Sequence, residues 1–244
     1  MSTDQIVGQI IKKIDQALDR GAEPIAAFDA DGTLWRNDIG EDFFEYQLQN
    51  KLIQNPLPSD PWKYYFDLKD EDPKKAYLWL AQVLKGHSQN EVRKWNEDCV
   101  SHLSPLPIIK EQQQLVSHLH KKGVEVFVVT ASIKWAVEAA AQLYKIDYDH
   151  VIGVTVKVTD EFLTDEQDGP VTYREGKMEG LLQKTNGRKP FYASGNTMGD
   201  ISLLENATHL SIAVTTVDVS HPNYKTEMEL QKEATKHGWL QLKL

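Results

Sequence analysis

Cysteine is almost absent from this 244-residue chain, since Cys99 is the only one. A lone cysteine excludes an internal disulfide and fits a reducing compartment, and we expect Cys99 to be a buried structural thiol. The sequence also lacks any apolar run near the roughly 20 residues that a membrane-spanning helix needs. Its first residues show no basic leader followed by an apolar segment. We therefore expect a cytoplasmic protein with no membrane partner.

An excess of positive charge is also missing. The formal net charge is −9 and the calculated pI is about 5.4. Nucleic-acid phosphates need a basic surface, so the composition argues against nucleic acid as the main partner. No internal repeat or low-complexity segment is visible, and the length allows one domain or two.

Apolar residues near the start follow a helical period. The stripe ends near Gly21 and consists of Ile6, Val7, Ile10, Ile11, Ile14 and Leu18. It predicts an amphipathic helix that docks on the core, with another subunit as the alternative. From Pro24 onwards, short apolar runs alternate with helical segments. This alternation predicts an α/β fold, a parallel sheet covered by helices on both faces.

Two aspartates follow the first short apolar run. Asp29 and Asp31 come directly after residues 24–28, and Gly32 and Thr33 follow them as turn formers. An aspartate can act as a covalent nucleophile towards a phosphoryl group, and paired carboxylates bind Mg²⁺ well. Without further matching segments, a solvated turn that closes a strand would explain the pattern equally well.

Three later segments carry matching chemistry. Thr130-Ala131-Ser132 follows the apolar run 124–129 and is suited to hold phosphate oxygens, although a strand-end threonine is more often a simple cap. Lys177 stands at the start of a predicted helix, where a solvated lysine is the commoner case. Asn196 and Asp200 belong to a glycine-containing loop after the run 190–194, which could form an oxygen-ligand site.

The four segments together resemble the haloacid dehalogenase (HAD) superfamily, in particular its phosphoserine-phosphatase-like branch. The resemblance covers the chain from about Pro24 to Ala213, and the run Asp-Ala-Asp-Gly-Thr-Leu at residues 29–34 is its most specific part. It implies a Rossmann-like parallel sheet core. It also implies a Mg²⁺-dependent phosphatase that acts on a small phosphate ester.

The resemblance also assigns roles to the residues. Asp29 becomes the nucleophile that forms an aspartyl-phosphate, and Asp31 becomes the acid/base. Thr130 and Ala131 contact the transferring phosphoryl group, and Lys177 neutralises it. The implied Mg²⁺ ligands are Asp29, the backbone carbonyl of Asp31, Asn196 and Asp200. Many relatives have aspartate where Asn196 stands, so one negative charge is missing here. Asp31 itself favours expulsion of an alkoxide, which benefits from a proton donor, over expulsion of a halide.

About a hundred residues separate Asp29 from Thr130, more than one crossover needs. The resemblance implies a helical cap domain at 40–105, inserted into a core made of 1–39 and 106–244. We expect linkers at Ile39-Gly40 and at residues 104–107. The cap is rich in aromatic side chains, which either pack among themselves or line a pocket for an apolar or cationic leaving group. They are Trp62, Tyr64, Tyr65, Phe66, Tyr77, Trp79 and Trp95.

The sequence does not identify the substrate. Phosphoserine phosphatases grip the amino acid with a glutamate after the first motif and with a cap arginine. Asp38 and Glu41 fall near the glutamate position, but Leu78 to Leu80 occupy the arginine position, and we expect Arg93 to face solvent. Phosphoserine is therefore not expected as the preferred substrate, and a phosphocholine-type ester is an alternative.

Two other function classes also remain. A catalytically weakened protein that binds a phosphate ligand is favoured only by Asn196. A phosphotransferase would pass the phosphoryl group to an alcohol instead of water. The acidic stretch 159–169 predicts a hairpin or loop, with a second metal site as a remote alternative.

Overall fold

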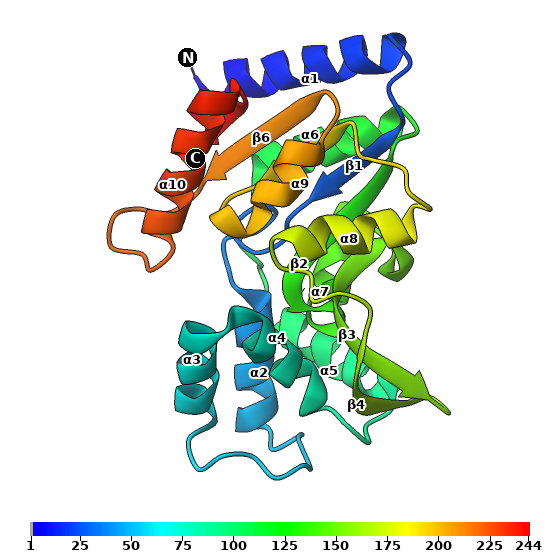
Figure 1. The fold of residues 1–244 in the computed structure, drawn as a ribbon, viewed down its shortest axis with the longest axis vertical. Helices are drawn as coiled ribbons and strands as arrows, with labels where there is room; N and C mark the ends of the chain where they lie inside the picture. The colour runs from blue at the N-terminus through cyan, green and yellow to red at the C-terminus, as the bar shows by residue number, and fades with distance from the viewer. Residues whose placement is uncertain (1) are drawn as a thin grey trace.

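The computed structural model describes residues 2–244; Met1, the first residue of the expected core segment 1–39, lies outside them. A seven-stranded sheet crosses the molecule in the order β4-β3-β2-β1-β5-β6-β7 (Figure 1). All neighbouring pairs are parallel except β3 and β4. The strands are β1 Ile25–Phe28, β2 Glu125–Ile133, β3 Val151–Thr159, β4 Phe162–Asp168, β5 Tyr192–Gly195, β6 Leu210–Thr215 and β7 Leu240–Lys243. The expected α/β fold with a mostly parallel sheet is confirmed.

Helices cover both faces of this sheet. As a consequence, every residue of β1 is buried. Ala26 and Phe28 pack with the apolar residues of α1, α6 and α7. Ile25 and Ala27 pack on the other side with those of α8, α9 and α10. The bounds are α1 Thr3–Asp19, α6 Lys110–Lys121, α7 Lys134–Ala141, α8 Glu175–Lys184, α9 Ile201–Asn206 and α10 Tyr224–His237. The sheet is therefore the middle of three layers, as expected for strands that are apolar on both faces.

The N-terminal helix α1 docks on the core, as expected, and lies against α6 and β7. Val7, Ile10 and Ile14 are its buried apolar residues. Asp15 joins α1 to α6 through His118 and Lys122, each 2.9 Å from its carboxylate.

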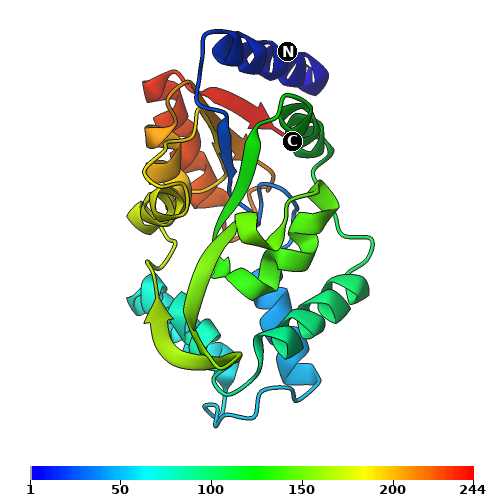
Figure 2. The ribbon, with the colours of Figure 1, turned by 90° about the vertical axis from the view of Figure 1, so that its right-hand side faces the viewer.

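Four helices are inserted between β1 and α6 and form the lower body of the molecule (Figures 1 and 2). They are α2 Ile39–Gln49, α3 Pro61–Glu71, α4 Pro73–Gln82 and α5 Gln89–His102. Pro61 and Pro73 each open a helix directly after an aspartate cap, the position where proline costs no hydrogen bond. The expectation that Ile39-Gly40 is a linker is wrong, because Asp38 caps α2 and both residues belong to its first turn.

The inserted helices are tied to the rest of the chain. Helix α4 packs on β3 and β4, and α5 packs on α7. The acidic stretch 159–169 contains the turn of the β3–β4 hairpin and the whole of β4, and the chain turns at Asp160 and Glu161, both with positive φ. Across residues 2–244, this hairpin included, no group of three or more histidine, cysteine or acidic side chains is placed to hold a metal ion. The expected hairpin is therefore present, and α4 packs on both of its strands.

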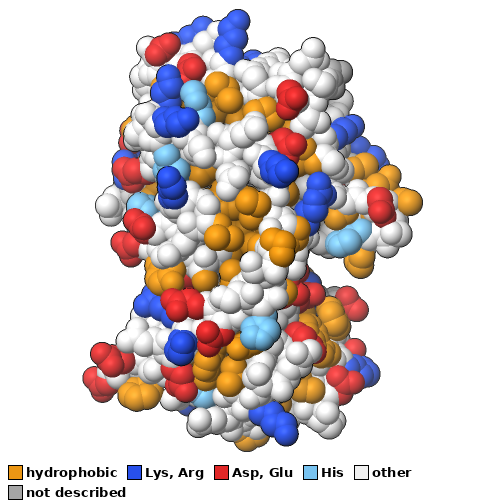
Figure 3. All heavy atoms as spheres, turned by 180° about the vertical axis from the view of Figure 1, so that it is seen from behind, with side chains coloured by type: hydrophobic (Ala, Val, Ile, Leu, Met, Phe, Trp, Pro, Cys, Tyr) orange, Lys and Arg blue, Asp and Glu red, His pale blue; other side chains and the backbone are white. Residues whose placement is uncertain are grey.

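Charges of both signs are interspersed on the face seen from behind in Figure 3, which carries no extended basic surface. Among the described helices, none is long and apolar enough to cross a bilayer. Cys99 is buried on α5, and burial raises the pKa of its thiol to about 12. A thiol in that state is a poor nucleophile, as expected for a structural cysteine.

Candidate active site

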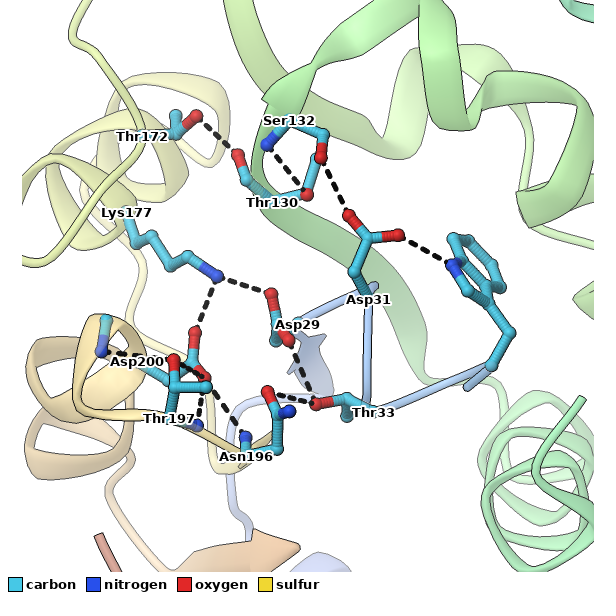
Figure 4. Close-up of polar contacts among 12 residues, drawn as sticks. Asp29, Asp31, Thr33, Thr130, Ser132, Thr172, Lys177, Asn196, Thr197 and Asp200 are labelled. Atoms are coloured by element: carbon cyan, nitrogen blue, oxygen red, sulfur yellow. Dashed lines mark hydrogen bonds and ion pairs between the residues drawn. The ribbon is translucent and has the colours of Figure 1, made fainter. Parts of the chain in front are cut away.

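The predicted site residues come together at the carboxyl ends of β1, β2 and β5, the central strands of the sheet. Phe28, the last residue of β1, pairs with Val128 of β2 and with Ser194 of β5. The segments that follow these three strands therefore meet at one edge, where open α/β sheets bind ligands. Figure 4 shows the polar side chains of these segments converging there. All seven predicted residues line one cavity of about 310 Å³: Asp29, Asp31, Thr130, Ala131, Lys177, Asn196 and Asp200.

A lysine between two aspartates forms the centre of the site. The Lys177 ammonium lies 2.5 Å from Oδ1 of Asp29 and 2.6 Å from Oδ1 of Asp200. Lys177 stands in the first turn of α8, and its side chain is only 2% exposed, so it is not the solvated surface lysine that is commoner at such positions. A buried charge is tolerated when it is paired and hydrogen-bonded, and here two carboxylates meet that need.

These contacts shift the acid–base equilibria of the pair. Burial raises the pKa of Asp29 to about 7, and the nearby Asp200 adds to this while Lys177 opposes it. Burial alone would lower the pKa of Lys177, but Asp200 and Asp29 outweigh it and the pKa rises. The ammonium therefore stays charged and can neutralise an anion brought to Asp29.

The second aspartate is held differently, by neutral donors. Oδ2 of Asp31 accepts a 2.7 Å hydrogen bond from the Ser132 hydroxyl. Oδ1 accepts one of 2.7 Å from the Trp35 indole N–H and one of 3.0 Å from the backbone N–H of Ile39. Burial raises the pKa of Asp31, and the hydrogen bonds from Ser132 and Trp35 oppose this rise. Asp31 has no cationic partner among the described residues, so its carboxyl group is free to exchange a proton.

Thr130 lies at the irregular end of β2. The sequence places it after the strand, but β2 continues to Ile133, and its pairing with β3 shifts register between Val129 and Ile133. The Thr130 hydroxyl accepts the backbone N–H of Ser132 at 3.1 Å, and no protein acceptor for its proton is found in residues 2–244. That proton can be donated to a ligand oxygen. Ala131 lines the cavity beside it.

Asn196 closes the site on the β5 side. Its Oδ1 lies 3.4 Å from the Thr33 hydroxyl, which also donates to Oδ2 of Asp29 at 2.9 Å. The close approach depends on Gly32, which has φ +75°; a Cβ there would lie 2.1 Å from Nδ2 of Asn196. Asp200 is fixed by the backbone N–H groups of Asn196 and Thr197, at 3.0 and 2.9 Å from its Oδ2.

This donor set fits a hard divalent cation. The oxygens of Asp29 and Asn196 converge on one hydroxyl, and Asp200 is adjacent. The nitrogen that contacts Asp29 and Asp200 is the charged Lys177 ammonium, which cannot be a metal ligand, and no histidine or cysteine is among the described residues that line the cavity. Mg²⁺ prefers such oxygen ligands and is commonly held by one or two carboxylates with water and substrate phosphate. Two carboxylates and one amide carry less negative charge than three carboxylates would.

The other end of the cavity is formed by the inserted helices. Asp38, Glu41, Tyr65, Lys69 and Tyr77 line it from α2, α3 and α4. Two of the seven cap aromatics thus face the cavity. Others pack among themselves: Trp62 and Trp79 contact Phe44, and Tyr64 contacts Trp79. Part of the set therefore packs among itself and part lines the cavity, while contact with a leaving group stays a prediction. Tyr77 contacts Tyr173 of the segment before α8, with ring centroids 5.6 Å apart.

The expectation that Arg93 faces solvent is wrong. Its guanidinium forms a two-pronged ion pair with Glu138 of α7, with N–O distances of 2.8 and 3.2 Å, and the Glu138 side chain is 1% exposed. Arg93 therefore joins α5 to the core and does not reach the cavity.

Sequence reasoning missed several residues that hold the site in place. Thr33 follows the two aspartates directly, and Ser132 follows Thr130, so proximity to a recognised motif could have indicated both. Glu227 and Lys69 carry no such signal. Glu227 lies on α10 and is fully buried against Asn196, and Lys69 lies on α3.

This chain is similar to known proteins in sequence and in fold. The family model of haloacid dehalogenase-like hydrolases matches residues 26–205. A phosphorylcholine phosphatase of Pseudomonas aeruginosa is 25% identical over an alignment of 185 residues. The match covers 60% of this chain and 52% of that protein, so it spans about half of that protein's length.

Solved structures share the fold. A protein of unknown function from Bordetella pertussis Tohama I has a TM-score of 0.72 at 19% identity, covering 90% of this chain and 98% of that one. A phosphoserine phosphatase, solved as an analogue of its phospho-aspartyl intermediate, has a TM-score of 0.52 at 17% identity, covering 88% and 98%. With its family model matched over well more than half its length, the chain belongs to the haloacid dehalogenase-like hydrolases.

Proposed function

We propose that this protein is a Mg²⁺-dependent phosphatase that hydrolyses a small phosphomonoester through an aspartyl-phosphate. The observation that carries the proposal is the buried bridge from Asp29 through Lys177 to Asp200, in a cavity that also contains Asp31 and Thr130. Phosphoryl transfer needs positioning and positive charge around the phosphoryl oxygens more than it needs other covalent chemistry. These side chains supply the nucleophile, the charge and a hydrogen-bond donor in one place.

In the first step an Asp29 oxygen attacks phosphorus, and the bond from phosphorus to the ester oxygen breaks. Asp31 gives its proton to the departing alkoxide, a transfer that its raised pKa favours. Lys177 and the Thr130 hydroxyl hold the phosphoryl oxygens. In the second step Asp31, now ionised, takes a proton from water. The water oxygen bonds to phosphorus and the bond to Asp29 breaks, which releases phosphate.

Mg²⁺ would be held by Asp29, Asn196, Asp200 and the backbone carbonyl of Asp31, and it would supply further positive charge beside the phosphoryl group. The carboxylate and amide oxygens of these residues support the choice of this ion. We infer from Asn196 a weaker metal site than three carboxylates would give.

The inserted helices, spanning most of 40–105, act in this proposal as a cap over the reacting groups, and 1–39 with 106–244 form the core. The Tyr77–Tyr173 contact supports this, because it closes the cavity between α4 and the segment before α8. A cavity of about 310 Å³ suits a small metabolite. The single buried thiol Cys99 is compatible with a reducing, cytoplasmic location.

A second candidate narrows the substrate to an ester whose alcohol carries an organic cation, such as phosphocholine. Two tyrosines and two carboxylates, Tyr65, Tyr77, Asp38 and Glu41, line the leaving-group end of the cavity. Aromatic faces and carboxylates attract quaternary ammonium groups. The phosphorylcholine phosphatase named above is a partial relative of this chain and supports the same substrate class.

Hydrolysis of an aryl phosphate tests the proposed reaction. We expect turnover with Mg²⁺ that EDTA abolishes and added Mg²⁺ restores. Asp29→Asn should fall to background, and Asp31→Asn should fall about 10²-fold or more. Asp165→Asn, on the exposed β3–β4 hairpin, is the matched control. Ligand binding without turnover would identify a binding protein instead, and product transfer to an added alcohol would identify a phosphotransferase.

A further inference from the structure

Acidic and aromatic side chains line the leaving-group end of the cavity. Its walls carry the carboxylates of Asp38 and Glu41 and the rings of Tyr65, Tyr77 and, from outside the cap, Tyr173. Desolvation and the negative charges of Asp31 and Glu41 raise the pKa of Asp38 well above its ordinary value, so Glu41 is the acid here that holds an ion pair. Tyr65 is buried, and its hydroxyl donates a 3.3 Å hydrogen bond to Oε1 of Glu41. Carboxylates together with aromatic faces form the chemical environment in which proteins hold alkylammonium groups.

A cation of the protein itself already occupies this environment. The Lys69 ammonium lies 2.7 Å from Oε1 of Glu41. It also lies 5.2 Å from the ring centroid of Tyr65 and 5.7 Å from that of Tyr77, both within the range of a cation–π contact. The same rings and carboxylate that a ligand cation would need are therefore in contact with a lysine.

We propose that Lys69 is an internal competitor for cationic leaving groups, an inference that rests on the proposed phosphatase function of this cavity. A substrate ammonium takes its place on Tyr65, Tyr77 and Glu41 when the Lys69 side chain swings out. Lys69 thereby sets a low affinity for the free alcohol product and for unrelated cations. Specificity then favours esters whose phosphate is held at the same time by Lys177.

The Lys69 side chain has the properties that such an exchange requires. It is 29% exposed, and its Glu41 partner is 26% exposed, so the ammonium has a path to water. Partly exposed ion pairs contribute little stability, because water and salt compete with them. The four-carbon stem of lysine rotates freely enough to move the charge while the stem stays on the helix surface. Lys177, with two buried carboxylates, has none of this freedom.

Direct binding of tetramethylammonium tests the inference without any turnover. Isothermal titration calorimetry would compare the wild-type protein with Lys69→Met, which keeps the length of the side chain and removes its charge. We expect Lys69→Met to bind tetramethylammonium roughly tenfold tighter, the size of a well-formed cation–π contact. Lys63→Met is the matched control, because Lys63 lies on the same helix and pairs with Asp67 on the exposed surface. It should bind as the wild type does.

Two further variants keep the result decisive. Lys69→Arg retains the charge and should not tighten binding. Lys69→Gln repeats the loss of charge with a polar side chain and gives the expected gain if Lys69→Met folds poorly, which thermal denaturation would reveal. Unchanged or weaker binding in both uncharged variants would overturn the inference.

Kinetic measurements distinguish a failure of this inference from a failure of the proposed phosphatase function. Aryl phosphate hydrolysis by the wild type reports on the phosphatase reaction alone, so its absence would refute the function while the binding result stands. If Lys69→Met instead loses turnover of phosphoserine and gains no cation binding, then Lys69 holds a substrate carboxylate. That outcome also overturns the inference.

Discussion

The side-chain nitrogen of Asn196 donates a 2.9 Å hydrogen bond to Oε1 of Glu227, whose side chain is fully buried on α10 behind the active site. Glu227 also accepts the backbone N–H of Thr216 at 3.0 Å and that of Val217 at 3.4 Å. Because its nitrogen is committed to Glu227, the Asn196 amide turns its oxygen towards Thr33 and Asp29. Glu227 thus places a buried carboxylate directly against the Asn196 amide.

The hydrogen bond between Asn196 and Glu227 predicts that Mg²⁺ binding survives when the amide and the carboxylate exchange places. Glu227→Gln should weaken Mg²⁺ binding roughly tenfold, the usual effect of losing a partner that orients a metal ligand. Asn196→Asp alone should also weaken it, although it adds a third carboxylate to the site, because the new carboxylate would face Glu227 and the two could not both stay ionised. The double variant Asn196→Asp/Glu227→Gln restores a carboxylate facing an amide, and we expect it to recover binding. Titration calorimetry with Mg²⁺ measures all three. A double variant no better than the weaker single one would contradict the pairing.

A second prediction concerns Ser132, which donates to Asp31. This hydrogen bond favours the ionised carboxylate, so Ser132→Ala should raise the pKa of Asp31 further. The second step needs ionised Asp31, and the acidic limb of the pH–rate profile should move to higher pH. We expect a shift of roughly one unit, since a hydrogen bond to a charged group contributes about 1.5 kcal/mol.

The readout for Ser132 is the profile of kcat against pH for an aryl phosphate. Ser220→Ala, in an exposed loop, serves as the control because its hydroxyl bonds only to Asp218 among the described residues. A uniform loss of rate without movement of the acidic limb would mean that Asp31 is not the base that titrates there.

The sequence predicts which residues at strand ends belong to the site better than it predicts which helix residues do. Asp29, Thr130 and Asn196 follow apolar runs, and the parallel pairing of β1, β2 and β5 places them together without further information. Lys69 could not be predicted in the same way. Its place in the cavity depends on how α3 packs against α2 and α4, and short helix segments with mixed aromatic and charged residues do not encode that angle.

Arg93 is another residue whose environment the sequence does not predict. Its helix α5 has a polar sequence, which predicts a solvated side chain, but α5 packs on α7, where Glu138 is buried without another close cation. Lys134, at 3.9 Å, is at the edge of ion-pair range. The tertiary contact therefore decides the environment of Arg93, and local periodicity cannot report it.

The ion pair between Arg93 and Glu138 gives a third prediction. Arg93→Ala leaves the buried Glu138 carboxylate without its main partner and should lower the free energy of unfolding by about 3 kcal/mol. Lys94→Ala, one residue along and on the exposed side of α5, should change it little, because its contact with Asp98 is long and exposed. Urea denaturation measures both. Equal stability of the two variants would show that Glu138 is solvated or protonated without Arg93.

A companion variant separates the charge from the packing. In Arg93→Ala/Glu138→Gln the buried charge is removed together with its partner. We expect this double variant to recover part of the stability that Arg93→Ala loses, because an uncharged amide costs less to bury than an unpaired carboxylate.

The last prediction concerns the docking of α1 and its dependence on pH. Hydrogen bonds from Lys122 and His118 lower the pKa of Asp15 below its ordinary value of 3.8. A carboxylate whose pKa is lower in the folded state stabilises the fold above the unfolded pKa and loses this contribution as pH falls through the folded one. Asp15→Asn should therefore be less stable than the wild type at neutral pH, and the difference should shrink steadily as pH falls below about 4. Denaturation at a series of pH values measures this, with Asp70→Asn, an exposed aspartate of α3, as control. A difference that stays constant down to the lowest pH would mean that Asp15 acts through packing and that its charge does not hold α1 on α6.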